Sequence, residues 1–400
     1  MNSSPPISVP DSLDDDRYSR FRLIPWWDQE KIRKTKILVI GAGALGNEIL
    51  KNLALTGFEQ IVVVDPDRIE RSNLSRAVLF RESQIGRPKA DAAAETLTSL
   101  SNSVRAQPLK ANVMFDCGLG IFLWSDIVLA GLDNREARLW INRAAWKAGR
   151  PWVDGAIEGI NGLARVFLPG VAPCYECTLG ETDWALLRRR MSCNLLTYES
   201  AIEGKVPTTP TIASIIAGIE VQEAVKWIHG LPTLSSKALV FEGLNHTSYV
   251  VQYTENPDCM SHEQFPKVIR LPMRSSEITL ADLLERARDD LRAKDVVVEF
   301  SREIIRALEC PGCGTVTDVF APAGSVTVDE GRCPRDGQGR AALAVHSYSG
   351  VELFGSRSLA EIGLPAFDVF VARSPAGEIA YCVAGDEADV LGSLAAATVG

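Results

Sequence analysis

The chain has 400 residues, of which 46% are hydrophobic, and a formal net charge of -9. This length can bury a substantial core and predicts two or three domains. The negative charge argues against nucleic acid as the principal partner, because binding a phosphate backbone depends on Lys and Arg. We see no apolar run near the roughly 20 residues of a membrane helix and no signal-peptide pattern at the start, so we expect a cytoplasmic protein without a membrane partner.

The first 16 residues are rich in Pro, Ser and Asp, and we expect them to form a disordered tail. Beyond them, apolar strand-like runs alternate with helical stretches from Lys36 to about Met260. The runs cover residues 36–40, 61–64, 126–130 and 152–153. This alternation predicts an α/β fold with a mainly parallel, Rossmann-like sheet and crossover helices.

A glycine-rich turn follows the first of these strands. It reads Gly41-Ala-Gly43-Ala-Leu-Gly46, and the next apolar run ends on Asp65. Glycines allow a phosphate to approach the backbone at a helix N-terminus, and an acid at the end of the next strand can hold ribose hydroxyls. The turn therefore predicts a nucleotide site, although by itself it does not distinguish NAD from ATP.

The residues after Asp65 favour ATP. Cations, an acid and an amide follow within a short stretch: Asp67, Asn73, Arg76, Arg87 and Lys89. A dinucleotide dehydrogenase does not need this cluster. It suits a triphosphate whose charge must be offset while a nucleophile attacks phosphorus.

Three further motifs identify a family resemblance. The segments are Arg17-Tyr-Ser-Arg20, Ser72-Asn73-Leu-Ser-Arg76 and Leu132-Asp133-Asn134-Arg-Glu-Ala-Arg138. Together with the glycine turn, they make residues 17–142 resemble the ubiquitin-activating (E1) superfamily of adenylating enzymes, which includes the activators of the molybdopterin and thiamine sulfur carriers.

The resemblance implies a role for each matched residue. Asp133 would hold Mg²⁺ beside Asn134, Arg76 and Lys89 would offset phosphate charge, Asn73 would hydrogen-bond the phosphates, and Asp65, next to Asp67, would bind the ribose. In the family the N-terminal arginine reaches across a dimer, so Arg20 predicts a homodimer. The implied reaction is ATP-dependent adenylation of the C-terminal glycine of a ubiquitin-like protein.

Two short hooks, Cys174-Tyr-Glu-Cys177 and Cys259-Met-Ser-His262, have the spacing of a tetrahedral zinc site. We expect a structural Zn²⁺ that ties the end of the adenylation domain to its middle. The family commonly has a Cys-x-x-Cys pair at both places, and here His262 replaces the fourth cysteine.

Cys193 is outside any Cys-x-x-Cys pair and follows three arginines, Arg188 to Arg190. Neighbouring positive charge favours the thiolate and lowers a thiol pKa. In the activators of ubiquitin and its closest relatives, the thioester cysteine follows the first hook at a comparable place. We therefore predict that Cys193 is the catalytic nucleophile that passes the modifier to an E2-like conjugating enzyme.

Residues 211–229 have helical periodicity, with Pro210 before them and Gly230 as the stop. His229, near the helix end, is expected to interact with the helix dipole as a charge partner. A strand pair over 239–245 and 248–254 then leads to Cys259. Residues 264–400 contain strand-like runs at 268–272, 296–300, 367–372 and 378–383, and a helical run at 279–290. This order predicts a β-grasp or ubiquitin-fold module.

A ribbon-like segment, at about 303–348, interrupts that module. Cys310-Pro-Gly-Cys313 and Cys333-Pro-Arg-Asp336 resemble two zinc knuckles, with Asp in place of the last cysteine. Because Asp can bind zinc but such a site can also be a relic, occupancy is left open. Cys117 and Cys382 stand in apolar surroundings and are expected in the core.

The sequence thus predicts an adenylation domain over 17–263, with the cysteine segment at about 178–210, and a C-terminal module over 264–400. ATP, Mg²⁺ and Zn²⁺ are the expected cofactors. The chain resembles the activating component of bacterial ubiquitin-like conjugation operons linked to phage defence. A sulfur-carrier adenylyltransferase is the nearest alternative, and a non-catalytic Rossmann dinucleotide-binding module is the distant one.

Overall fold

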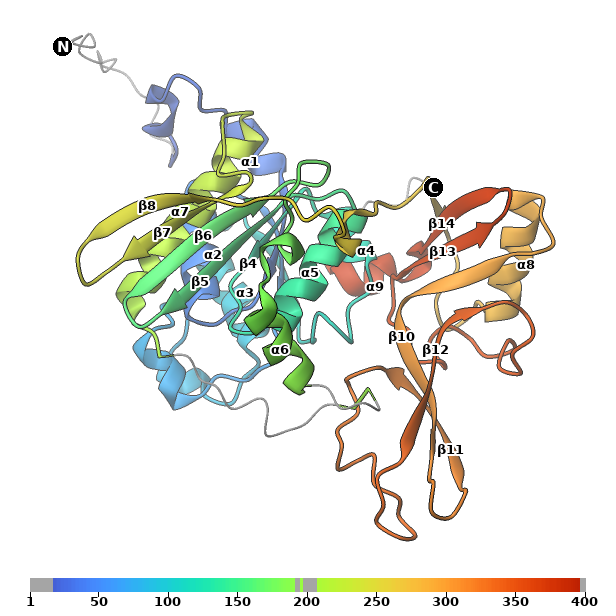
Figure 1. The fold of residues 1–400 in the computed structure, drawn as a ribbon. Coiled ribbons are helices and arrows are strands. Elements are labelled where there is room, and N and C mark those ends of the chain that lie inside the picture. Colours follow the sequence, from blue (N-terminus) through green and yellow to red (C-terminus); the bar gives the residue numbers. More distant parts are fainter. Residues whose placement is uncertain (1–16, 191–194, 197–206, 396–400) are drawn as a thin grey trace.

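The computed structural model describes residues 17–190, 195–196 and 207–395 (Figure 1). Its larger sheet has eight strands in the order β3-β2-β1-β4-β5-β6-β7-β8. Neighbouring strands from β3 to β5 are parallel, and those from β5 to β8 are antiparallel. The strands are β1 (Lys36–Ile40), β2 (Gln60–Val64), β3 (Arg105–Leu109), β4 (Ile127–Ala130), β5 (Trp152–Glu158), β6 (Asn161–Phe167), β7 (Lys237–Glu242) and β8 (Thr247–Gln252).

The central strands are apolar on both faces because each face packs against helices. Ile37 and Val39 of β1 join a core with α2, α3 and α7, whereas Leu38 and Ile40 join a second core with α4 and α5. The helices are α1 (Gln29–Lys34), α2 (Ala44–Thr56), α3 (Lys89–Leu100), α4 (Gly120–Trp124), α5 (Arg135–Lys147), α6 (Glu181–Arg190) and α7 (Pro210–Ile228). The expected α/β fold is confirmed.

The second sheet belongs to the C-terminal part and has the order β11-β10-β13-β14-β9, with β12 also paired to β10. Its elements are β9 (Val268–Leu271), α8 (Leu280–Leu291), β10 (Val297–Glu309), β11 (Val316–Pro322), β12 (Ala341–Tyr348), β13 (Val369–Ser374), β14 (Gly377–Val383) and α9 (Glu387–Leu391). The strand, helix and strand order agrees with the sequence analysis. The identification of this module with a β-grasp fold stays a prediction.

The long strand β10 is shared by two structures. Its first residues pair with β13 and with the end of β12, and from Ile304 onward it pairs with β11 and β12, with a register shift between Ile305 and Ala307. Figure 1 shows β10 leaving the second sheet and entering a separate lobe with β11 and β12. We call residues 304–348 the ribbon insert.

The two sheets pack against each other through the core that contains α4 and α5. Arg302 donates to the carbonyl oxygens of Met114 and Cys117, at 2.8 and 2.7 Å, and lies 3.7 Å from a carboxylate oxygen of Asp368. Asp368 in turn accepts from the backbone N–H of Leu119 at 2.8 Å. The C-terminal module is therefore held on the large sheet by buried polar contacts as well as apolar packing.

His229 does not act as a charge partner of the α7 dipole. Its Nε2 accepts a hydrogen bond from the backbone N–H of Asp28 at 2.9 Å, and its Nδ1 lies 2.7 Å from the carbonyl oxygen of Val225. Accepting at one nitrogen and donating at the other requires a neutral ring. The expectation was wrong because the sequence does not reveal that Asp28 approaches this helix end.

No helix among the described residues is long and apolar enough to span a membrane.

Candidate functional site

The glycine turn connects β1 to α2 and packs tightly on the turn that follows β4. Gly41 has a φ of +94°, and a Cβ there would lie 2.4 Å from the carbonyl oxygen of Gly131. A Cβ on Gly46 would lie 1.9 Å from the carbonyl oxygen of Gly41. Both positions need glycine for steric reasons, one in the turn and one in the first part of α2.

Gly43 has a different environment. It is the N-cap residue of α2, and a Cβ there would meet no atom within 4 Å. Open space therefore lies in front of the N-terminus of a helix of 13 residues, where N–H groups and the helix dipole favour an anion. This arrangement suits a phosphate group.

Asp65 follows β2 and fixes the turn from the side. Its two carboxylate oxygens accept from the backbone N–H groups of Ala42, at 2.7 Å, and Asp67, at 2.8 Å. Burial raises the pKa of Asp65, and the nearby charge of Lys89 opposes that rise. Asp65, the residue expected to bind the ribose, thus also holds the backbone of the glycine turn in place.

Lys89 begins α3 and points back to the same loop. Its Nζ lies 2.7 Å from Oδ2 of Asp67, and its N–H donates to the carbonyl oxygen of Asp67 at 2.9 Å. The lysine side chain is 11% exposed, whereas that of Asp67 is 64% exposed. A buried ammonium group with a single exposed partner is well suited to receive an anionic ligand.

Asn73 and Arg76 lie in the short 3-10 helix Arg71–Ser75 and just after it. Asn73 Oδ1 accepts from the N–H of Glu70 at 3.0 Å, and the guanidinium of Arg76 donates to the carbonyl oxygen of Ser72 at 2.8 Å. Both side chains are half-buried. They stabilise the local turn, and Arg76 keeps a charged group partly accessible.

Asn47 was missed by the sequence analysis, although it ties this segment to the glycine turn. Its Nδ2 donates to the carbonyl oxygen of Ala42 at 2.7 Å, and its Oδ1 accepts from the N–H of Leu79 at 2.9 Å. The side chain is fully buried. The available signal was an amide among apolar residues in the first turns of α2.

Asp133 and Asn134 follow β4, whose turn touches the glycine turn. Asp133 is exposed, and Asn134 caps α5 by accepting from the N–H of Ala137 at 2.8 Å. Because β2, β1 and β4 are adjacent and parallel, their carboxyl ends share one edge of the sheet. The predicted nucleotide residues from Gly41 to Asn134 therefore gather at that edge.

Arg20 does not join this group within one chain. The neighbouring ring of Tyr18 lies against Gly57, at the C-terminal end of α2, and Arg17 donates to the carbonyl oxygen of Leu100 at the end of α3. The glycine turn is at the opposite end of α2, about 18 Å away by helix geometry. The segment that carries Arg20 therefore lies toward the end of α2 that is remote from the glycine turn.

A buried charged cluster below the site was also not anticipated. Asp154 of β5 is fully buried and pairs with Arg138 at 2.8 Å and with Arg165. Glu220 of α7 lies over Gly155, and neither of its carboxyl oxygens makes a hydrogen bond to the described residues. Burial, and then the charge of Asp154, raise the pKa of Glu220 well above its ordinary value.

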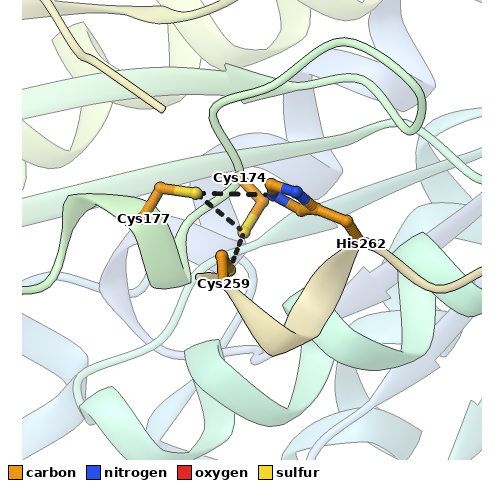
Figure 2. A group of neighbouring side chains, drawn as sticks. All are labelled: Cys174, Cys177, Cys259 and His262. Atoms are coloured by element: carbon orange, nitrogen blue, oxygen red, sulfur yellow. Dashed lines mark hydrogen bonds between the residues drawn. The ribbon is translucent and has the colours of Figure 1, made fainter. Parts of the chain in front are cut away.

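The two predicted zinc hooks come together near α5, as Figure 2 shows. The ligand atoms are separated by 3.8 Å between Cys174 and Cys177, 3.5 Å between Cys174 and Cys259, and 3.4 Å between Cys177 and His262. Tetrahedral zinc places sulfur atoms about 3.8 Å apart and sulfur and nitrogen about 3.5 Å apart. These residues therefore fit Zn²⁺.

Ring stacking, an ion pair and a hydrogen bond hold the two hooks in place. Trp146 of α5 stacks on the ring of His262 with centroids 4.7 Å apart. Glu176 pairs with Arg143 at 3.0 Å and accepts from Ser261, which joins the two hooks directly. A metal here would fasten the segment after β8 to the segment after β6.

The second cysteine group also forms. Cys310, Cys313, Cys333 and Asp336 bring their ligand atoms within 4.8 Å of one another.

Cys117 and Cys382 are buried, as expected. The predicted nucleophile, Cys193, lies outside the described residues.

A family model described as the ThiF family matches residues 16–261. Similar proteins include a NEDD8-activating enzyme E1 catalytic subunit from Arabidopsis thaliana, 43% identical over 36% of this chain and 34% of the relative. The SAMP-activating enzyme E1 of Haloferax volcanii is 31% identical over 61% of this chain and 87% of its own length. This chain thus covers only about a third of the NEDD8 subunit.

Among solved structures, E. coli MccB crystallised with ATP resembles the chain with a TM-score of 0.53. The matched region covers 63% of this chain and 75% of MccB, with 20% sequence identity. This likeness is one of fold.

Proposed function

Since the chain belongs to the ThiF family, we propose that it is an E1-type enzyme that adenylates the C-terminal glycine of a ubiquitin-like protein with ATP. The observation that carries this proposal is a placement by topology: Lys89 bonds to Asp67 in the loop after β2, which also holds Asn73 and Arg76, and Asp133 follows β4, and these two strands flank β1 and its glycine turn. This set combines cations for phosphates with a carboxylate for Mg²⁺. The names of the relatives, activating enzymes for NEDD8 and SAMP, support the same reaction class.

In the first step, a carboxylate oxygen of the terminal glycine attacks the α-phosphorus of ATP, and the bond to pyrophosphate breaks. The N-terminus of α2 beyond Gly43 would hold phosphate oxygens. Lys89 would exchange its exposed partner Asp67 for the phosphates, and Arg76 would add a second cation. Asp133 would hold Mg²⁺, which supplies further neutralisation of phosphate charge when bound.

Arg20 would complete the site from a partner subunit. Its segment lies at the far end of α2 in its own chain. A homodimer in which each N-terminal segment reaches the other site fits this separation. The proposal therefore includes a dimer as the active form.

In the second step, the thiolate of Cys193 attacks the acyl carbon of the adenylate, and AMP leaves. Adenylates are strongly activated, so a positioned thiolate suffices. The resulting thioester would then pass to a cysteine of an E2-like conjugating enzyme. The C-terminal module over 264–400 supports this reading over the sulfur-carrier alternative, which needs no such partner.

The test is incubation with ATP, Mg²⁺ and a candidate ubiquitin-like protein, followed by intact mass and a non-reducing gel, beside a Cys193→Ala variant. A thiol-sensitive adduct that disappears in the variant supports the proposal. Pyrophosphate exchange without an adduct in either protein favours the sulfur-carrier adenylyltransferase. Tight NAD binding without exchange favours a dinucleotide-binding module. The link to phage defence and the cytoplasmic location stay predictions, which this experiment does not address.

A further inference from the structure

The short described segment Leu195–Leu196 is anchored on the ribbon insert. Leu196 is 3% exposed and forms a small apolar core with Ile305 and Leu308 of β10. The carbonyl oxygen of Leu195 accepts from the N–H of Gly324 at 3.0 Å. A chain segment that belongs in sequence to the adenylation domain thus docks more than a hundred positions away, on the C-terminal module.

The opposite wall of this anchor is Gly331. A Cβ on Gly331 would lie 2.4 Å from a methyl carbon of Leu196, so only glycine leaves room for the leucine. The carbonyl oxygen of Gly331 is held by the buried guanidinium of Arg340 at 3.0 Å. Leu196 therefore occupies a fitted pocket rather than an open apolar surface.

The second cysteine group lies immediately beside both walls of the pocket. Cys310 is two residues after Leu308, and Cys333 is two residues after Gly331. The sulfur atoms of Cys313 and Cys333 are 3.7 Å apart, and Cys310 Sγ is 3.3 Å from Oδ2 of Asp336. Tetrahedral zinc needs about 3.8 Å between sulfurs and about 3.5 Å between sulfur and oxygen.

The insert has little else to hold this end together. Apart from the Leu196 core, the group is surrounded by exposed residues such as Gly312, Gly314 and Gln338. Backbone bonds close each knuckle locally, from Gly314 to Cys310 at 2.9 Å and from Gly337 to Cys333 at 2.9 Å. A metal ion would join the two knuckles to each other, as structural zinc does in small domains.

We propose that Cys310, Cys313, Cys333 and Asp336 bind a second structural Zn²⁺, and that this ion clamps the two walls of the Leu196 pocket. The thiolates favour Zn²⁺ over Mg²⁺ or Ca²⁺, which prefer oxygen ligands. Because Leu196 is three residues from Cys193, the ion fixes one end of the segment that carries the proposed nucleophile. Only this last consequence rests on the proposed function.

The first test is the metal content of the purified full-length protein by plasma mass spectrometry. Two zinc ions per chain are expected. The Cys259→Ser variant, which removes a ligand of the first site, should keep one. A single zinc ion in the wild-type protein, or none in Cys259→Ser that remains folded by circular dichroism, overturns the proposal.

The second test measures the clamp by hydrogen exchange at the amide of Gly324, which bonds to Leu195. Asp336→Ala should lose the second zinc on mild chelation and exchange this amide at least tenfold faster. Asp336→Cys, which restores four protein ligands, should keep both the zinc and the protection. Asp329→Ala, an exposed acid of the same insert, is the matched control and should behave as wild type.

Protection at Gly324 that does not change when the second zinc is lost overturns the clamp. Failure of the proposed function gives a different pattern. Wild-type protein with two zinc ions and a protected Gly324, but without pyrophosphate exchange, would reject the E1 assignment and leave the zinc clamp in place.

Discussion

The ammonium group of Lys89 lies 2.7 Å from Oδ2 of Asp67, with the lysine 11% exposed and the aspartate 64% exposed. This unequal pair suggests that the lysine is preorganised for a ligand and the aspartate is a replaceable partner. We expect Lys89→Ala to lower ATP–pyrophosphate exchange by about 10²- to 10³-fold, because one charge-stabilising donor is lost.

The folded structure should tolerate that change, since the remaining carboxylate of Asp67 is mostly in water. Thermal unfolding of Lys89→Ala checks this point. Arg71→Ala, which removes an exposed cation paired with Glu82, is the control and should keep its exchange rate. Equal rates in wild type and Lys89→Ala would remove Lys89 from the mechanism.

Substitutions at two glycines of the turn should separate binding from folding. Gly46→Ala puts a methyl group 1.9 Å from the carbonyl oxygen of Gly41, so the turn must move. Gly43→Ala meets no protein atom and keeps a negative φ, so the fold should persist. We expect Gly46→Ala to lower the melting temperature.

By contrast, Gly43→Ala should melt as wild type and bind ATP at least tenfold more weakly by calorimetry. Its methyl group projects into the space assigned to phosphate. Unchanged affinity in Gly43→Ala would place the phosphates elsewhere.

Arg302 should be essential for attachment of the C-terminal module. Arg302→Ala leaves the fully buried Asp368 without its cation, and such a loss costs about 3–5 kcal/mol of unfolding free energy. Arg302→Lys should not restore stability, because one ammonium group cannot reach the carbonyls of both Met114 and Cys117 as the guanidinium does. Urea unfolding measures both variants.

Arg306→Ala is the matched control on the same strand. Arg306 is one-third exposed and lies 3.7 Å from Asp318, so its removal should cost less than about 1 kcal/mol. A similar loss in both variants would mean that Arg302 has no special role at the interface.

Cys259→Ser should unfasten the first zinc site. The variant is expected to lose one zinc equivalent and to become several kcal/mol less stable, because binding energy at a structural zinc site contributes to folding. Met260→Ser changes the adjacent, 84% exposed residue and should alter neither quantity. Full zinc content in Cys259→Ser would contradict the assigned ligand set.

Glu220 should make stability depend on pH. Its folded pKa is raised above the ordinary 4.5, so the folded chain holds the proton more tightly than the unfolded chain. Stability therefore falls as the pH rises from 4.5 toward the folded pKa, and it is regained as the pH falls. Glu220→Gln lacks this titration.

The free energy of unfolding of Glu220→Gln relative to wild type should thus increase by about 1.4 kcal/mol per pH unit in that window. Denaturant titrations at several pH values measure it, with the exposed Glu285→Gln as the control for adding an amide. A difference that is constant with pH, or that grows as the pH falls, would show that Glu220 is not held protonated.

Much of the candidate nucleotide site could be predicted from local sequence. The glycines, Asp65 and Asp133 follow β1, β2 and β4, and adjacent parallel strands bring their carboxyl ends to one edge. The candidate zinc hooks could be predicted equally well, because the spacing of Cys174, Cys177, Cys259 and His262 is typical of a zinc ligand set. In both cases the residues that determine the chemistry lie in short sequence motifs.

Other features depend on contacts between distant segments, which single-sequence periodicity does not encode. The neutral state of His229 depends on Asp28, the buried Glu220 depends on Gly155, and the Leu196 pocket depends on Gly331. Each pair is brought together only when helices pack on sheets or when the ribbon insert meets the adenylation domain. The sequence determined which groups can bind phosphate and zinc, and the tertiary structure decided which groups are buried, shared or coupled, because burial and long-range contact set their energies.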